Sequence, residues 1–560
     1  MGTFGIDLGT TYSCIAYIDE SGRPTLIKNA LGEDSTPSVV YFETPDNVVV
    51  GKDAKNSAKL YPELVISLIK REMGEDVEYS LHGELHTPES ISALILRELA
   101  RSAAEQTGQE VKDVVITVPA YFGVAEREAT RNAGKIAGLN VLNIVPEPVA
   151  AALHYESVGS GEDRTILVFD LGGGTFDTTV IRLSGDDINV VCTDGDHRLG
   201  GANWDEEIVL FLLAWFRSEH PEVDADSSEE FRQELIAAAE DMKKSLSTTR
   251  SRRYAMTYGG QTARAELTRD DLEELGSGLL ERTMYITERT IQTARAAGVT
   301  HFDDVLLVGG STRAPAVAAK LRERFGFEPK LHDPDQAVAK GAALFALIQS
   351  VKVLLPDEES EREDGDPAGA ARAELPEPRN DPDRVTLSQA QVEKVADQLG
   401  MSADKVRRLA VKSVTTVVPR AFGVKVLVAG DQPVPSWSIV HVLEANQPLP
   451  AAPEARQFYT AYPDQTMVEL EIWEQAGSIS SPNLADNNKI GDGIITGLPP
   501  LPKGSPIDVN FRMNDTGSLR VEAVELRTGT KLKIDLRIQG LSTAQVDEAR
   551  TSVARYALSE

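Results

Sequence analysis

The sequence has 560 residues, of which 41% are hydrophobic and 26% are charged, and its formal net charge is −30. This composition is typical of a soluble globular protein with two or three domains. The strong negative charge disfavours non-specific binding to nucleic acid or to anionic membranes. The first predicted strand leaves no room for a leader segment, and no apolar run looks long enough to cross a bilayer. We therefore expect a cytoplasmic monomer whose two cysteines, Cys14 and Cys192, are buried in strands.

Two stretches share one layout of strand, glycine turn and strand. They read FGIDLGTTYSCIAYID (4–19) and LVFDLGGGTFDTTVIRL (167–183). Glycine lets backbone N–H groups approach an anion closely, and aspartates beside such a turn suit a phosphate that carries a cation. A tight hairpin turn without a ligand would explain either stretch alone. Because the layout occurs twice, the sequence predicts two similar lobes that offer phosphate-binding turns to one cleft.

Residues 1–350 alternate strand-like and helical patterns, which indicates an α/β architecture with mixed sheets. A helix is predicted over 90–108, starting near Thr87, and a buried strand over 113–122, closed by Pro119. A third glycine turn, in VLLVGGSTRAPAV (305–317), ends a strand and precedes a helix that begins near Ser311. Helix N-termini after such turns attract anions.

The amino-acid composition changes after residue 350. VKVLLP (351–356) is short and apolar, and residues 356–383 form an acidic, Pro-rich stretch typical of a solvated linker. Residues 386–414 predict two short helices, which would form either a helix-turn-helix DNA reader or a packing hairpin. The acidic surroundings favour the packing hairpin. Alternating patterns over 415–541 predict an antiparallel β-sandwich, and 542–560 a final helix.

Six motifs in order resemble the nucleotide-binding signatures of the heat-shock protein 70 kDa family, of the DnaK type. They are GIDLGTTYSC, VPAYF with the Arg, AT, AG and AGLNV that follow it, EPVAAALHY, FDLGGGTFD, GDHRLGGANWD and VGGSTRAP. The resemblance implies a two-lobed actin/hexokinase-like ATPase domain over 1–350, an apolar then acidic linker over 351–385 and the helical pair over 386–414. It further implies a peptide-binding β-sandwich over 415–541 and a remnant of the family's helical lid over 542–560.

The resemblance also implies roles for individual residues at an ATP or ADP site. The two phosphate loops would be Gly9, Thr10, Thr11 and Tyr12, and Gly172, Gly173, Gly174 and Thr175, the last of which would also position the attacking water. Asp7 and Asp170 would hold a hydrated Mg²⁺, Asp177 an accessory cation such as K⁺, and Lys70 and Glu147 would act in catalysis. The adenosine side would comprise Glu240, Lys243, Lys244, Ser247, Gly309, Gly310, Ser311, Arg313 and Asp335. By themselves, several of these residues would be interpreted as turn caps or solvated helix residues.

Further residues match the family's interdomain relay and its peptide groove. Pro119 and Arg127 match a hinge that relays the nucleotide state, and VKVLLP resembles the apolar interdomain linker. The groove would be lined by Phe422, Val424, Val426, Phe458, Val468 and Leu470. Alternating apolar residues are also what any sandwich buries, so a core role is the alternative for these six.

The resemblance implies an ATP-dependent molecular chaperone that acts in protein folding and the stress response. It would hydrolyse ATP to regulate its binding of unfolded or extended polypeptide, with a nucleotide-exchange factor as a candidate partner. Three departures are evident: a short segment between Lys70 and residue 90, Asn143 and Pro146 at positions linked to J-protein docking, and a long spacer before the sandwich. They leave a J-protein partner open. The alternatives are an ATP-sensing scaffold with one dedicated protein partner and, by fold alone, a small-molecule kinase.

Overall fold

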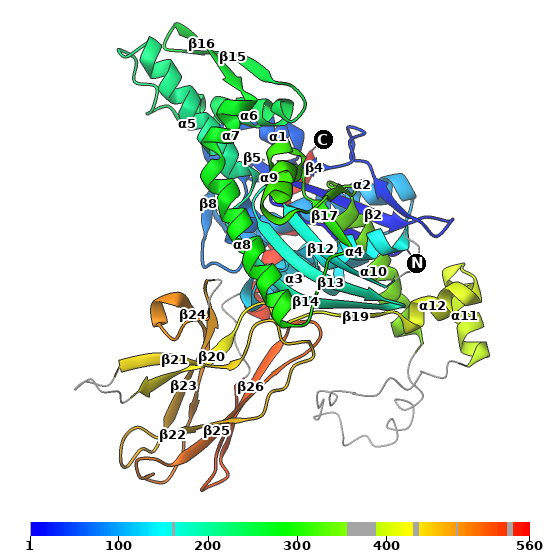
Figure 1. The fold of residues 1–560 in the computed structure, drawn as a ribbon, viewed down its shortest axis with the longest axis vertical. Coiled ribbons are helices and arrows are strands. Elements are labelled where there is room, and N and C mark those ends of the chain that lie inside the picture. The colour runs from blue at the N-terminus through cyan, green and yellow to red at the C-terminus, as the bar shows by residue number, and fades with distance from the viewer. Residues whose placement is uncertain are drawn as a thin grey trace.

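The structure, a computed structural model, describes residues 2–158, 163–355, 388–428, 436–477, 480–534 and 541–559. Two lobes form the upper body of the molecule, and a β-sandwich lies below them (Figure 1). The predicted acidic stretch over 356–383 lies outside the described residues.

Lobe I is built on a sheet of strand order β11-β10-β1-β2-β3, with β4 paired to β2. β1 and β2 form an antiparallel hairpin, and β10 runs parallel to β1. The helix predicted from Thr87 is confirmed: the Thr87 side chain caps its first turn, and Gly108 ends it in the left-handed conformation. Helices α2 and α3 pack on one face of the sheet, and α10 packs on the other. These elements are β1 (Phe4–Asp7), β2 (Tyr12–Ile18), β3 (Pro24–Ile27), β4 (Thr36–Pro37), β10 (Asp113–Val118), β11 (Asn140–Pro146), α2 (Pro88–Thr107), α3 (Val124–Ile136) and α10 (Ala337–Leu354).

Lobe II repeats this design, which confirms the predicted pair of similar lobes. Its sheet has the order β18-β17-β12-β13-β14-β19; β12 and β13 form the antiparallel hairpin, and β17 runs parallel to β12. α4 packs on one face of the sheet and α8 on the other. The elements are β12 (Arg164–Leu171), β13 (Phe176–Ser184), β14 (Asp187–Asp196), β17 (Asp304–Val308), β18 (Lys330–Leu331), β19 (Ser413–Thr415), α4 (Glu147–Ser157), α8 (Ser277–Ala296) and α9 (Pro315–Phe325).

Each lobe carries an outer part that forms one wall of the space between the lobes. On lobe I this part is the sheet β28-β6-β5-β7 with α1; on lobe II it is helices α5 to α7 with the β15–β16 hairpin, at the top of Figure 1. The bounds are α1 (Lys52–Ser57), β5 (Val39–Thr44), β6 (Asn47–Val50), β7 (Val65–Ser67), β8 (Tyr79–Leu81), β9 (Glu84–His86), α5 (Gly201–Glu219), α6 (Glu229–Leu246), α7 (Arg269–Leu275), β15 (Ser251–Tyr258) and β16 (Gln261–Thr268).

The apolar stretch at 351–354 is helical, contrary to the prediction of an interdomain linker there. These residues form the last turn of α10, and Val351 is fully buried. The sandwich is instead reached through β19, which pairs in parallel with β14 of lobe II. Among the described residues, α10 is the one helix that is long and apolar enough to cross a membrane, whereas the sequence predicted no such segment. However, 61% of this helix is buried inside the protein. Its apolar residues are therefore explained by packing between the lobes.

The two helices predicted over 386–414 are present as α11 (Gln389–Leu399) and α12 (Ala403–Val411). Ser388 and Ser402 cap them, and Gly400 ends the first in the left-handed conformation. Their apolar sides pack against the end of α10, and Lys405 Nζ donates to the carbonyl of Gly22 in lobe I at 2.8 Å. This packing fits the hairpin interpretation rather than a DNA reader, since the apolar faces are used inside the protein.

The sandwich consists of two four-stranded antiparallel sheets, ordered β21-β20-β23-β24 and β22-β25-β26-β27. The inward side chains of both sheets form one apolar core. The strands are β20 (Phe422–Val428), β21 (Ser436–Leu443), β22 (Arg456–Tyr459), β23 (Val468–Gln475), β24 (Asn487–Ile495), β25 (Pro506–Met513), β26 (Leu519–Glu525) and β27 (Lys531–Ile534).

The C-terminal segment, predicted as a lid remnant, lies on lobe I. α13 (Thr543–Arg555) packs against α2 and α3, and β28 (Ala557–Ser559) pairs with β6. Val553 is fully buried in the core of lobe I, and the Tyr556 hydroxyl lies 3.1 Å from His86 Nε2. Val553 and Tyr556 are buried in the core of lobe I and hold this helix there, and its identity as a lid remnant stays a prediction.

Candidate functional site

The two hairpin tips face each other across a cleft between the lobes. The tip between β12 and β13 comes so close to the first hairpin that a Cβ on Gly173 would overlap the Thr11 side chain, and one on Gly174 would overlap Thr10. The Gly172 carbonyl also accepts hydrogen bonds from the Gly201 amide and from Ser311 Oγ. Glycine is therefore required at this tip by packing as well as by any ligand.

A cavity of about 750 Å³ opens between these tips. Of the predicted residues, it is lined by Asp7, Gly9, Thr10, Thr11, Tyr12, Lys70, Glu147, Asp170, Gly172, Gly173, Thr175, Glu240, Lys243, Lys244, Ser247, Gly309, Gly310, Ser311, Arg313 and Asp335. The structure thus brings together residues that are up to about 330 positions apart in the sequence. Gly174 and Asp177 lie beside this cavity, behind the tip and on β13.

Buried ionisable groups converge at the base of the cavity. Lys70 is 3% exposed and donates to Glu147 Oε1 at 2.5 Å. Asp170 lies opposite Asp177 in the register of β12 and β13. Asp7 accepts a hydrogen bond from Thr117 Oγ1 at 3.0 Å. Four carboxylates and one lysine therefore share a poorly solvated region.

The pKa values of these carboxyl groups reflect an excess of negative charge. Burial, reinforced by the charge of Glu147, raises the pKa of Asp7 to about 7, although Lys70 opposes the shift. The same two causes, burial first, raise the pKa of Asp177 to about 7 and that of Asp170 well above its ordinary value. A cluster of this kind is suited to a cation. Within the described residues, no three His, Cys, Asp or Glu side chains form a group that could hold a metal ion directly.

The far side of the cavity is closed by a charged clamp between the lobes. Glu240 of α6 accepts from the Tyr12 hydroxyl at 3.0 Å and pairs with Lys244 and with Lys55 of α1. Burial alone would raise the pKa of Glu240, but the two lysines outweigh it and hold the pKa at about 2. Lys243 is bound to the Gly201 carbonyl and to Asp205, at 2.8 and 2.7 Å.

Two contributors were missed by the sequence analysis. Lys55 lies on a short helix with no motif around it, so no local signal could have identified it. Arg71 donates to the Gly174 carbonyl and to Asn203, and so fixes the second tip. Its position next to Lys70 was the one available signal. The third glycine turn also differs from the prediction, because a short 3-10 helix (Gly310–Arg313) comes first and α9 begins only at Pro315.

The predicted hinge lies between the cleft and the sandwich. After β10, the amides of Ala120 and Tyr121 donate to Asp177 at 3.0 and 3.2 Å. Arg127 donates to the carbonyls of Phe122 and Ala120 and so holds this loop, which follows Pro119.

The same loop meets the sandwich through a buried ion cluster. Arg420 pairs with Glu126 of α3 at 3.0 Å and with Glu474 of β23 at 3.3 Å, and lies over the ring of Tyr121. Glu474 accepts from the Val124 amide at 3.2 Å. A continuous set of contacts therefore connects Asp177 in the cleft to the sandwich.

The predicted peptide groove is largely core. Phe422, Val424, Val468 and Leu470 are all less than 10% exposed and belong to the core between the two sheets. Val426 and Phe458 are half-buried at its margin. The core alternative therefore describes four of the six residues, because their side chains point between the sheets rather than outward.

This fold and this cleft define the class of protein: a two-lobed actin/hexokinase-like ATPase-type domain followed by a β-sandwich. Comparison with known proteins gives the family. The family model described as Hsp70 protein matches residues 3–81, 75–358 and 432–560. The chain is 34% identical over 563 aligned positions to the "Chaperone protein DnaK" of two strains of Halobacterium salinarum, ATCC 29341 / DSM 671 / R1 and ATCC 700922 / JCM 11081 / NRC-1. Each alignment covers 99% of this chain and 78% of the relative. The chain belongs to the Hsp70 family.

Proposed function

We propose that the protein is a cytoplasmic, ATP-dependent chaperone of the DnaK type. In this proposal, residues 1–350 bind and hydrolyse ATP, and residues 415–541 bind unfolded or extended polypeptide. The observation that carries the proposal is the buried cluster of Lys70, Glu147, Asp7, Asp170 and Asp177 at the base of a cleft framed by two glycine tips. Family membership and the relatives' name support it.

The chain's own groups suit phosphoryl transfer to water. Backbone amides at the two tips would hold the phosphates, and Lys70 would offset charge on the group transferred. The carboxylates Asp7, Asp170 and Asp177 fit a hydrated Mg²⁺, with K⁺ as an accessory ion, and such ions would supply neutralisation of the phosphate charge. Glu147 orients Lys70 through their 2.5 Å contact, and Thr175 would align the attacking water. The lobe clamp of Glu240, Lys55 and Lys244 would close the cleft over the nucleoside.

Polypeptide binding would use the exposed apolar side chains of the sandwich. Trp437, Tyr459, Tyr462, Met467 and Ile494 are each about half exposed. An extended peptide could pair with an edge strand and place alternate side chains against such a surface. An exchange factor remains a candidate partner, and a J-protein partner remains open.

A second candidate function is an ATP-sensing scaffold with one dedicated partner. It is favoured by the burial of Phe422, Val424, Val468 and Leu470, because side chains that fill the core are not available to line a site for many different peptides. This candidate predicts ATP-dependent binding of one protein without stimulation by peptides.

The test is steady-state ATPase activity of the full chain with Mg²⁺ and K⁺, with and without an apolar extended peptide. Lys70→Ala should abolish hydrolysis, whereas Lys394→Ala, on the exposed face of α11, should leave it unchanged. Stimulation by peptide would support the chaperone. Hydrolysis that ignores the peptide would favour the scaffold, and hydrolysis that survives Lys70→Ala would contradict the proposed site.

A further inference from the structure

A serine, a histidine and an asparagine of the sandwich form one chain of hydrogen bonds. Ser480 Oγ lies 2.8 Å from His441 Nδ1, and His441 Nε2 lies 3.0 Å from Asn487 Oδ1. His441 belongs to β21 and Asn487 is the first residue of β24, so separate segments of the sandwich meet here. A hydroxyl, a ring nitrogen within hydrogen-bond distance of it and a third group that orients the ring are the parts of an activated nucleophile. None of the three residues lines the nucleotide cleft.

The hydrogen bonds of Asn487 decide which ring nitrogen of His441 carries the hydrogen. Asn487 Nδ2 donates to the carbonyls of Ser481 and Asn483, at 2.9 and 2.7 Å. The amide oxygen of Asn487 therefore faces the imidazole, and this oxygen can only accept. The network thus assigns the hydrogen to His441 Nε2 and leaves a lone pair on Nδ1. The Ser480 hydroxyl donates to that lone pair, which is the direction that general-base activation of a hydroxyl requires.

The surroundings of His441 hold the base in place beneath an exposed hydroxyl. The imidazole is buried, and the carbonyl of His441 accepts from Arg456 Nη1 at 2.7 Å. The loop that carries the serine is fixed to β21, because the Pro482 carbonyl accepts from the Ile439 amide at 2.8 Å. Ser480 itself is exposed. A reagent in solution can therefore reach the hydroxyl while the base keeps its orientation.

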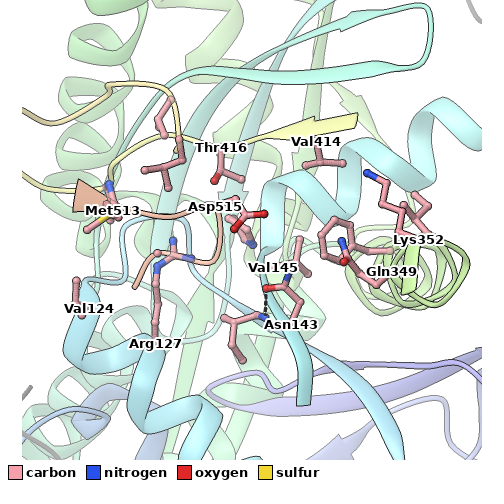
Figure 2. A pocket seen from close by; sticks show the side chains of 18 residues that line it. Val124, Arg127, Asn143, Val145, Gln349, Lys352, Val414, Thr416, Met513 and Asp515 are labelled. Carbon is pink, nitrogen blue, oxygen red and sulfur yellow. Dashed lines mark hydrogen bonds between the residues drawn. The ribbon is translucent and has the colours of Figure 1, made fainter. Parts of the chain in front are cut away.

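Docking of the sandwich on the lobes leaves this hydroxyl accessible. One contact between the sandwich and lobe I is lined by Met513 and Arg127 (Figure 2). A second contact lies close to the serine in the sequence, where the Tyr121 hydroxyl donates to the Gly477 carbonyl at 2.6 Å. Ser480 is exposed in this docked arrangement, so its reactivity does not require the sandwich to leave the lobes.

We propose that Ser480 is a nucleophile that accepts an acyl group from a thioester or an activated ester, with His441 as its general base. Ser480 Oγ forms a bond to the carbonyl carbon of the donor, and its proton passes to His441 Nδ1. The C–S or C–O bond of the donor then breaks, and the leaving thiolate or alkoxide takes the proton from Nδ1. Asn487 accepts from Nε2–H throughout and keeps the ring oriented, and the product is an acyl ester of Ser480.

Two other serines of the chain are internal controls, since neither donates to an imidazole. Ser481 lies next to Ser480, and its hydroxyl donates to Asp486 Oδ2 at 2.5 Å. This hydrogen bond and that from Asn483 lower the pKa of Asp486, which makes its carboxylate a weak base. Ser542 is exposed like Ser480, but its hydroxyl donates to the neutral amide oxygen of Gln545 at 2.8 Å.

The test adds p-nitrophenyl acetate and S-acetyl-N-acetylcysteamine separately to the full chain and measures acetylation of each serine by tandem mass spectrometry. Ser480 should be acetylated about a hundredfold faster than Ser481 and Ser542 by at least one donor, because only Ser480 has a general base. Reaction with one donor alone identifies the leaving group that the site accepts. Rates at Ser480 and Ser542 that agree within about threefold for both donors would overturn the proposal.

A second arm removes the base. His441→Gln should slow acetylation of Ser480 about a hundredfold, to the rate of Ser542, whereas the control His301→Gln, at an exposed site on lobe II, should not change it. Hydrogen exchange of the Ile439 amide reports whether the loop stays in place in the variant. Fast acetylation of Ser480 with Ile439 still protected would contradict the role of His441; if the loop is lost, the comparison of the serines in the parent protein decides. Either failure leaves the proposed ATPase untouched, since that depends on Lys70.

Discussion

Arg420→Met is expected to loosen the contact between the sandwich and lobe I. The guanidinium is 3% exposed and lies between the carboxylates of Glu126 and Glu474, at 3.0 and 3.3 Å. Methionine keeps an apolar chain of similar length but removes the charge. The two carboxylates are then buried together with no cation between them, and removal of one partner from such a pair costs about 3–5 kcal/mol.

The loss should depend on pH, and its sign follows from Glu474. Burial raises the pKa of Glu474 to about 7, Arg420 opposes that rise and Glu126 reinforces it. Docking thus takes up a proton near neutral pH, so docking weakens as pH rises through this value. Without Arg420, the pKa of Glu474 rises further, and the penalty should be largest at about pH 8 and smaller at about pH 6.

Hydrogen exchange of the segment spanning residues 119–127 reports this docking directly. A loss of about 3 kcal/mol corresponds to roughly a hundredfold lower protection of these amides at about pH 8. Glu474→Gln should reduce the effect of Arg420→Met, because the buried charge is then gone. Arg512→Met, on the exposed side of β25, is the matched control. Protection within about threefold of the parent protein, or an equal loss at both pH values, would refute this reasoning.

Three further outcomes are expected. Gly174→Ala should lower the thermal stability of the nucleotide-free protein because its Cβ meets Thr10, whereas Gly172→Ala, with only ordinary contacts, should not; equal melting temperatures would contradict the close approach of the tips. Val553→Ala should cost about 2 kcal/mol of local stability and expose the C-terminal segment to proteolysis; an unchanged cleavage rate would place that segment elsewhere. Burial lowers the pKa of His86 from its ordinary value of 6.5, so the folded protein favours the neutral imidazole. As pH falls below about 6.5, protonation of His86 should therefore release the same C-terminal segment, and His86→Gln should remove this pH dependence.

The sequence predicted the lobes well because their signals are local. Glycine turns between apolar strands occur at both tips, and the Thr87 and Gly108 signals set the ends of α2. Ser388, Gly400 and Ser402 likewise set the helix pair. Caps and turns act within a few residues, so neighbouring letters are enough to predict them.

The errors arose where an apolar segment had more than one place to pack. Residues 351–354 are apolar enough to form either an interdomain linker or the end of a buried helix. They are helical because this end of α10 packs against α11 and α12. Phe422 and Leu470 each belong to an alternating apolar pattern that would suit a peptide groove or a core. The second sheet of the sandwich covers both side chains, so they are core residues. Lys55 acquires its role only because α1 and α6 meet across the cleft.

Turns, caps, periodicity and motif order lie within short windows of the sequence, so they were enough to predict the two-lobed ATPase-type fold, the strand-rich second domain and the family. Which charges share a buried space, in contrast, depends on how distant segments pack together. The cluster around Lys70 and the Arg420 ion cluster each combine residues from distant segments. The pKa shifts in these clusters arise from burial and from the charges nearby, which depend on what packs around a group and not on its neighbours in the chain.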